Sequence, residues 1–199
     1  MDYADYGKVA NRNKTDIITL VLKYYKLFMP TPYSFTCTCC GKTYDEVPLC
    51  FGGEYPDYYF NVPPEEREQR VEMAESLCVI DDHYFHRGRI TIPITDHEED
   101  LVFNVWTSIS KENFEIRNDL WNDPARVDHA PYFGWLQTVV LTYNGTINIK
   151  TVARENEPGL IPSIEVIEED HPLRNDQQNG ITFKTALEKV QQILKEWHK

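Results

Sequence analysis

Two segments near the ends of the chain carry the apolar spacing of a helix. Between Thr15 and Met29 apolar residues recur three and four positions apart, and Pro30 follows directly, so we predict a helix there. Residues 182–197 show the same spacing and begin with Thr182, whose hydroxyl suits a helix N-cap. The predicted buried stripe of this C-terminal amphipathic helix consists of Ala186, Leu187, Val190, Leu194 and Trp197.

The middle of the chain alternates apolar and polar residues, as half-buried strands do. Isoleucines occupy every second position near the end of residues 83–95, which predicts a strand there, and a similar alternation predicts a strand at 101–109. Residues 77–80 form a shorter apolar run that we also interpret as a strand. The acidic residues 96–100 between the two longer strands predict the loop of an antiparallel hairpin.

The second half of the chain contains the strongest turn signal. Asn144-Gly145 lies between alternating apolar residues, a combination typical of a two-residue hairpin loop. We therefore predict paired strands at 136–143 and 146–153, with a further strand at 161–168.

Two internal helices are predicted from their start signals. Residues 64–74 begin with proline followed by acids, which suits the first turn of a helix. Residues 111–122 follow Ser110, whose side chain can cap a helix N-terminus. These elements predict a single α+β domain over 35–199, with a mainly antiparallel sheet flanked by helices. Residues 1–34 are then an N-terminal extension with one helix.

Charge and composition narrow the class of partner. The 199 residues carry a net charge of −12, and a surface of that sign repels phosphate backbones, so we expect no nucleic-acid partner. The acidic runs 96–100 and 168–170 are interpreted as solvated loops, with a surface that meets a basic protein as the alternative. No apolar run reaches the about 20 residues that span a bilayer, and the N-terminus lacks a secretory signal. We therefore expect a cytoplasmic protein without a membrane partner.

The stretch from Phe35 to Gly41, Phe-Thr-Cys-Thr-Cys-Cys-Gly, contains the candidate metal site. Cys37 and Cys40 have two residues between them, a knuckle spacing that lets two thiolates face one zinc ion. Zinc in a structural site usually takes four ligands, and the strong form of this signal has two such pairs. With one pair, reduced structural thiols are the favoured interpretation and structural zinc is the alternative. Redox catalysis is disfavoured because no helix is predicted after Gly41.

Four other residues are candidates for contact with a ligand or partner. Arg87 could meet an anion in a groove whose aromatic walls are Tyr132 and Trp135. The alternative, which we favour, is a packed aromatic corner whose glycines admit close backbone approach. His171 precedes a proline in a predicted loop and is expected to cap a hydrogen-bond network.

These residues belong to a set of motifs that is dispersed along the chain. The motifs are Phe35-x-Cys37-x-x-Cys40-Gly41, Pro56-Asp57-x-Tyr59, Glu66-Arg67-x-x-Arg70, Cys78-x-Ile80, Phe85-x-Arg87-Gly88, Val105-Trp-x-Ser-Ile-Ser110, Tyr132-Phe-Gly-Trp-Leu136, Thr146-Ile-Asn-Ile-Lys150, His171-Pro-Leu173, Gln177 and Gly180-Ile181. Together they resemble the bacterial domain of unknown function 2199 family over about residues 35–198. The resemblance implies a soluble bacterial protein with no established activity, so it supplies no catalytic residues.

The resemblance also extends the candidate metal site. Cys78 accompanies the knuckle in the family pattern, which makes it the third candidate zinc ligand. A histidine is expected soon after the knuckle, but Tyr44 stands there. The candidates for the missing ligand are Cys39, Cys50, His83 and His86. The first of these is adjacent to Cys40, which makes joint binding by both awkward. The two histidines point to opposite faces of one strand and are expected at the surface.

The sequence favours binding over catalysis, because no catalytic set is recognisable in it. We expect a domain that interacts with a basic protein, as a small acidic immunity protein does when it neutralises a basic toxin. The alternative is a zinc-containing enzyme or a small-molecule-binding protein whose site lies near the knuckle. The sequence predicts no oligomeric state.

Overall fold

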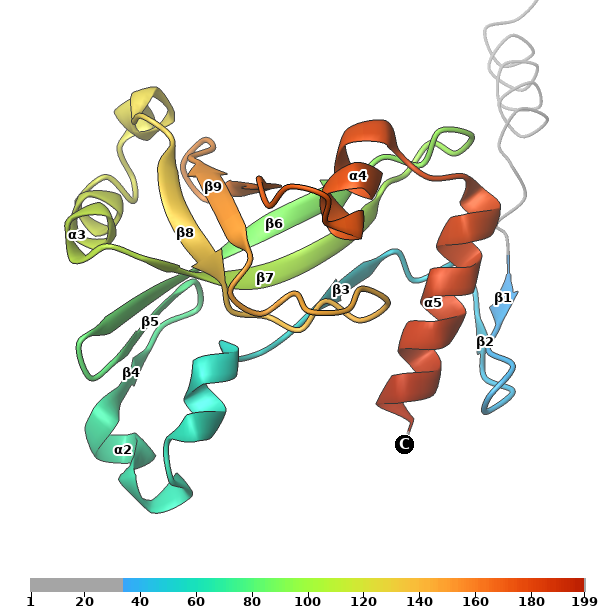
Figure 1. The fold of residues 1–199 in the computed structure, drawn as a ribbon, viewed down its shortest axis with the longest axis horizontal. Helices are drawn as coiled ribbons and strands as arrows, with labels where there is room; N and C mark the ends of the chain where they lie inside the picture. The colour runs from blue at the N-terminus through green and yellow to red at the C-terminus, as the bar shows by residue number, and fades with distance from the viewer. Residues whose placement is uncertain (1–33, 199) are drawn as a thin grey trace, which may run out of the picture.

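The computed structural model describes residues 34–198 (Figure 1). The predicted helix at 15–29 lies outside the described residues, so the N-terminal extension stays a prediction. The strands are β1 (Phe35–Thr36), β2 (Thr43–Tyr44), β3 (Cys50–Gly52), β4 (Val71–Met73), β5 (Leu77–Ile80), β6 (His83–Ile92), β7 (Leu101–Ile109), β8 (Tyr132–Leu136), β9 (Lys150–Arg154) and β10 (Ser163–Val166). The helices are α2 (Arg67–Arg70), α3 (Lys111–Asp119), α4 (Pro172–Asn179) and α5 (Phe183–Trp197), and the 3-10 segments are η1 (Asp57–Asn61), η2 (Pro64–Glu66) and η3 (Pro124–Asp128).

Strands β6 to β10 close into a small barrel. Antiparallel pairing joins β6 to β7 along nearly its whole length, and then β7 to β8, β8 to β9 and β9 to β10. A parallel contact between Ser163 of β10 and Arg89 of β6 completes the ring. Strand β3 adds to β7 in parallel, while β5 and β4 extend the sheet from β6.

The α+β class is confirmed, but the expectation of a mainly antiparallel sheet flanked by helices is corrected. The sheet is mixed and closed, with parallel contacts at both β3–β7 and β10–β6. Periodicity reveals strands and the hairpins between chain neighbours, and the strands at 77–80 and 101–109 are found as predicted. It carries no signal for a pairing such as β6 with β10, whose partners are distant along the chain.

The barrel interior and the inner face of α5 form one hydrophobic core. Its buried strand residues include Ile90, Ile92, Leu101, Phe103, Val105, Leu136, Ala153, Ile164 and Val166. Helix α5 adds Ala186, Val190, Ile193 and Leu194. The predicted C-terminal helix is confirmed, and its N-cap Thr182 accepts a hydrogen bond from the N–H of Thr185 at 3.2 Å. Trp197 departs from the predicted stripe, because 55% of its surface is exposed.

The helix predicted at 64–74 is wrong beyond its first turns. Only η2 and the single turn α2 form there, and Val71 begins β4 by pairing with Ile80. Residues 64–70 contain no apolar side chain after the first proline, so a longer helix would have no face to bury. The edge-strand pairing therefore prevails over the helix start signal.

Asn144-Gly145 does not form the predicted two-residue hairpin loop between paired strands, although β8 and β9 do pair. Strand β8 ends at Leu136 and β9 begins at Lys150, so residues 137–149 form a long loop between them. Thr146 holds this loop together, because its hydroxyl donates to the carbonyl of Thr138 at 3.1 Å and accepts from the N–H of Val140 at 3.0 Å. Side-chain hydrogen bonds replace the predicted ladder.

Helices α5 and α3 lie at opposite ends of the molecule (Figure 1). Helix α5 stands beside the barrel with the β1–β2 hairpin on its other side. Among residues 34–198, no helix combines the length and the apolar character that crossing a membrane requires.

Candidate metal centre

The knuckle cysteines lie in the turn between β1 and β2. The two strands pair antiparallel, with Phe35 opposite Tyr44. Gly41 adopts φ of +72°, a conformation that favours glycine, and its N–H donates to the carbonyl of Cys37 at 2.9 Å. This tight reversal turns the cysteine side chains out of the strands and towards α5. We refer to residues 35–44 as the cysteine hairpin.

His198, directly after α5, faces this hairpin. Four side chains there each offer one ligand atom, and these atoms all lie within 4.8 Å of one another. The four residues, which we call the Cys–His cluster, are Cys37, Cys39, Cys40 and His198. The Cys39 sulfur lies 2.8 Å from the Cys37 sulfur and 3.3 Å from His198 Nδ1. The cluster could hold a metal ion.

Gln191 of α5 fixes the hairpin against the helix. Its Oε1 accepts from the N–H of Thr38 at 3.1 Å, and its Nε2 donates to the Cys37 sulfur at 3.4 Å. The hydrogen bond from the Cys39 thiol, aided by Gln191, stabilises the thiolate and lowers the pKa of Cys37 to about 6. The same contact raises the pKa of Cys39 to about 11. Cys37 is thus prepared as a thiolate, the form that binds metals.

The donor set of the Cys–His cluster fits zinc. Tetrahedral zinc binds thiolates at about 2.3 Å and imidazole nitrogen at about 2.0–2.1 Å, so bound sulfurs lie about 3.8 Å apart. The sulfurs of Cys37 and Cys39, now 2.8 Å apart, would separate by about 1 Å around an ion. Four protein ligands leave no position for water, which is typical of a structural zinc site. Cys39 and Cys40 both belong to the cluster, although their adjacency argued against joint binding.

Cys78, the predicted third ligand, is not part of the cluster. It lies on β5 and is fully buried in a separate apolar group. The other buried members of that group are Val62, Ile80, Phe85 and Trp106. Burial raises the pKa of the Cys78 thiol to about 12, so it stays protonated and packs as a small apolar side chain.

The remaining ligand candidates are also placed elsewhere. Cys50 on β3 accepts a hydrogen bond from Asn104 at 3.6 Å, and His83 packs against Tyr58 with ring centroids 4.6 Å apart. His86 is fully buried at the end of the barrel, so the expectation of a surface histidine is wrong for this residue. The alternation of residues along β6 places His83 and His86 on opposite faces of the strand. The sequence does not show that α3 covers the inner face, which carries His86.

An apolar pocket lies between the C-terminal part of α5 and strands β3 and β7. Its volume is about 240 Å³, and its walls come from β3, η1, β7, α5 and residues 138–141. Trp197 forms one wall and packs edge-to-face on Phe51, with ring centroids 5.3 Å apart. Asp57 is the charged residue among the described residues that line it, and no lysine or arginine does so. Trp197 directly precedes His198, so two consecutive residues contribute to the pocket and to the cluster, respectively.

The predicted groove of Arg87, Tyr132 and Trp135 does not form. Arg87 donates to the carbonyl of Gly53 at 3.3 Å, whereas Tyr132 points into the barrel and donates to Glu155 at 2.5 Å. Trp135 lies on the outer surface and lines a different hollow. The structure therefore brings none of these side chains to a common site.

The glycines near these residues fit the packed interpretation. A Cβ on Gly88 would lie 2.5 Å from the side chain of Ile164, and one on Gly134 would lie 2.5 Å from the carbonyl oxygen of Ser108. At Gly134 the close neighbour is backbone, whereas at Gly88 the space is filled by the Ile164 side chain, so both positions are packed too closely for a Cβ without a shift of the neighbour.

His171 caps helix α4, which the sequence analysis did not predict. Its Nδ1 accepts from the N–H of Leu173 at 3.2 Å, and its Nε2 contacts the carbonyl of Asn144 at 3.1 Å. The side chain thus ties the start of α4 to the loop between β8 and β9.

Sequence reasoning missed His198 and Gln191 because all ligand candidates came from residues 37–86, which are far from the end of α5 in the sequence. A signal was nevertheless present. His198 follows a well-capped amphipathic helix directly. A helix that ends in a histidine can bring this ligand to a distant cysteine pair.

Comparison with known proteins identifies a family. A family model described as an uncharacterized protein conserved in bacteria (DUF2199) matches residues 36–181. The match includes the three cysteines of the cluster and ends before α5. No curated protein and no solved structure matches the chain.

Proposed function

The chain belongs to the family of uncharacterized proteins conserved in bacteria, DUF2199, and from this premise we propose that it is a zinc-containing binding domain for a basic protein partner. One observation carries the proposal: Trp197 lines the apolar pocket while the next residue, His198, belongs to the Cys–His cluster. Zinc at the cluster would fix this turn of chain and with it a wall of the pocket. The role of the ion is structural.

The state of the cysteines supports a reducing location. All five cysteines lack a disulfide bond, and three of them belong to the cluster. Free thiols persist in the cytoplasm, where they remain available to zinc. A cytoplasmic location is therefore part of this proposal.

Metal content tests the structural role of zinc. We expect one zinc ion per chain in the untagged protein, and we expect a chelator to reduce the free energy of unfolding by about 3–4 kcal/mol, the value for zinc at 100 to 1,000 times its Kd. Cys40→Ser and His198→Ala should each lower zinc affinity, because each removes one ligand. The matched controls Cys50→Ser and His83→Ala should not do so. Equal zinc content in all four variants would contradict the proposal.

The lining of the pocket supports a cationic side chain as its occupant. Tyr55, Phe60 and Trp197 present aromatic rings, and Asp57 adds a carboxylate. Aromatic faces attract lysine and arginine, and a carboxylate strengthens this attraction. The volume of about 240 Å³ is below that of most small-molecule sites and is suited to one inserted side chain.

The charge of the molecule supports the same class of partner. The net charge is −12, and residues 96–100 are all exposed. The second acidic run, at 168–170, is partly exposed. Such a surface raises the association rate with a basic protein, and salt screens this effect.

Capture from a native lysate, followed by binding assays with the purified partner, tests this proposal. Charge reversal at 98–100 or at 168–170 should slow association, whereas Asp57→Asn and Trp197→Ala should speed dissociation by about tenfold or more. Phe133→Ala removes a similarly exposed aromatic side chain away from the pocket and serves as the control. Unchanged affinity in the pocket variants would exclude the pocket from the interface.

The alternative function is a zinc-containing enzyme or a small-molecule-binding protein. The observation that favours it is that Trp197, which lines the pocket, is followed directly by His198, which belongs to the cluster. A catalytic zinc ion keeps a position open to water. Turnover of a metabolite that His198→Ala abolishes, in a variant that still binds zinc, would establish this alternative and exclude the structural role.

A further inference from the structure

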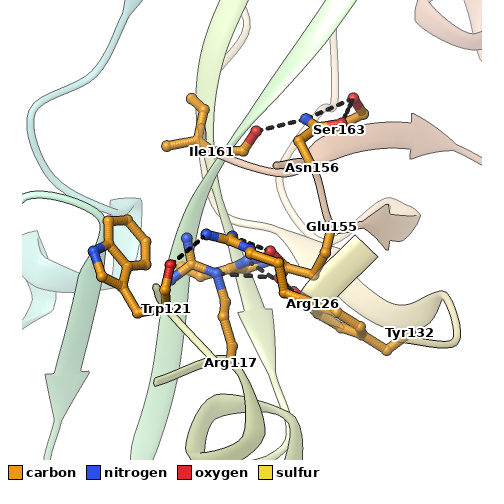
Figure 2. A network of polar contacts seen from close by, with 9 residues as sticks. Arg117, Trp121, Arg126, Tyr132, Glu155, Asn156, Ile161 and Ser163 are labelled. Atoms are coloured by element: carbon orange, nitrogen blue, oxygen red, sulfur yellow. Dashed lines mark hydrogen bonds and ion pairs between the residues drawn. The ribbon is translucent and has the colours of Figure 1, made fainter. Parts of the chain in front are cut away.

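A second polar cluster closes the end of the barrel near α3. It brings together Arg117 of α3, Arg126 of η3, Tyr132 of β8 and Glu155 after β9 (Figure 2). His86 of β6 contacts Tyr132 of this group. All five residues are buried. Neither the sequence motifs nor the Cys–His cluster accounts for this group, so its chemistry has to be explained separately.

One carboxylate in the cluster serves two guanidinium groups. Arg126 Nη2 forms a short ion pair with Glu155 Oε2, while Arg117 Nε lies 3.3 Å from Glu155 Oε1 (Figure 2). Tyr132 donates its hydroxyl proton to the same Oε1 at 2.5 Å. The acceptor capacity of Glu155 is therefore shared among three side chains.

The cluster has an excess of positive charge. Burial lowers the pKa of His86 well below its usual value, so this imidazole is neutral, and burial raises the pKa of Tyr132, so the phenol keeps its proton. Arginine remains protonated in proteins. Two guanidinium groups and one carboxylate leave a charge of +1. An isolated buried charge is strongly unfavourable unless another charge compensates it.

Several buried polar atoms of the cluster have no hydrogen-bond partner within residues 34–198. These atoms are Nη1 and Nη2 of Arg117, Nε of Arg126, Nε2 of His86 and Oγ1 of Thr107. Arg117 Nε also makes no hydrogen bond, but it keeps its ion pair with Glu155. Thr107 is the cross-strand neighbour of His86, so their side chains share the inner face of the barrel. Buried polar groups of native proteins are normally paired with protein, water or a ligand.

Proton positions define what His86 can bind. The hydroxyl proton of Tyr132 is used by Glu155, so the 3.4 Å contact between Tyr132 Oη and His86 Nδ1 needs a proton on Nδ1. The neutral ring then carries a lone pair on Nε2, which is an acceptor. Arg117 offers donors and His86 Nε2 offers an acceptor in the same buried group.

Trp121 covers the two arginines. Its ring centroid lies 5.2 Å from the guanidinium carbon of Arg117 and 5.2 Å from that of Arg126, and its backbone carbonyl accepts from Arg126 Nη1 at 3.1 Å. Trp121 is itself partly exposed, so it separates the buried cations from solvent.

We propose that this cluster binds a small hydroxyl-bearing oxyanion, such as dihydrogen phosphate or hydrogen carbonate. Arg117 donates to its oxygens, His86 Nε2 accepts from its hydroxyl group, and Trp121 covers the site. One negative charge balances the excess charge of +1. Chloride would balance the charge but would leave the acceptor of His86 without a donor.

Titration of the full chain, first dialysed exhaustively into a buffer without oxyanions, tests the proposal. Tryptophan fluorescence and the midpoint of thermal unfolding are measured with phosphate, with hydrogen carbonate, and with chloride at matched ionic strength and pH. We expect phosphate, hydrogen carbonate or both to bind saturably. The midpoint of thermal unfolding should rise with the concentration of the oxyanion that binds. Comparison of the phosphate and hydrogen carbonate titrations identifies the ligand, and chloride should give no saturable signal.

Variants assign the binding to this site. Arg117→Gln should abolish the oxyanion effect, whereas Arg154→Gln, which removes an exposed arginine, should keep it. Trp121→Phe retains an aromatic cover, so it should keep the rise in midpoint while losing the fluorescence change. If Arg117→Gln does not fold, the Trp121→Phe result decides. The proposal is overturned if neither oxyanion binds the wild type saturably, or if Arg117→Gln or Trp121→Phe retains the full fluorescence response.

Discussion

At the scale of single residues, Gly134 shows how tightly the barrel is packed. A Cβ at this position would lie 2.5 Å from the backbone carbonyl oxygen of Ser108, which cannot rotate away as a side chain can. We expect Gly134→Ala to reduce the free energy of unfolding by about 1–3 kcal/mol. Gly53→Ala is the control, because its nearest contact would be an ordinary 3.5 Å. Chemical denaturation measures the free energy of unfolding of both variants. Equal stability of the two variants would contradict the packing described for β7 and β8.

His86 predicts a dependence of stability on pH. Its pKa in the folded state is well below 6.5, mainly because of burial and also because of Arg117, so acid protonates the unfolded chain first. Stability is therefore complete above about pH 6.5 and decreases as the pH falls towards the folded-state pKa. Between pH 7.5 and pH 5.5 the wild type should lose about 1.4 kcal/mol more than His86→Gln.

Urea denaturation at the two pH values measures this difference. The cysteine hairpin is present in both proteins, so its own titration cancels in the comparison. The groups that face His86 are Tyr132, Thr107 and Arg117, and all of them remain in the variant. Identical pH dependence of wild type and variant would show that folding does not lower the pKa of His86, which would contradict its burial without a compensating charge.

At the scale of elements, the start of α4 depends on His171. Its imidazole accepts from the N–H of Leu173 and so satisfies one of the free donors at the helix N-terminus. We expect His171→Ala to reduce the free energy of unfolding by about 1 kcal/mol and His171→Asn, which can also cap, to restore most of it. Loss of binding to a partner without a loss of stability would instead assign His171 to an interface.

The elements also show which local signals decide structure. Helix α5 was predictable because its cap and apolar stripe agree with its packing on the barrel. The helix predicted at 64–74 does not form over its full length because no apolar face follows its start signal. Val71 pairs with β5 instead. Helix α4 was missed because its cap is a histidine, which is not among the usual N-cap residues.

At the scale of the whole molecule, contacts between distant parts of the chain account for what sequence could not show. The closing pair of β6 with β10 and the approach of His198 to the knuckle both join residues far apart in the chain. The knuckle itself was visible from its spacing, so two of the cluster residues, Cys37 and Cys40, were predicted. The buried arginines were not, because an arginine that is covered by another element has the sequence appearance of a surface residue.

X-ray absorption at the zinc edge of the purified full chain tests the central claim most directly. The account predicts three sulfur ligands at about 2.3 Å and one nitrogen ligand at about 2.0–2.1 Å, with the nitrogen lost in His198→Ala. A chain without zinc, or a spectrum that His198→Ala leaves unchanged, would contradict the claim that the metal joins α5 to the cysteine hairpin.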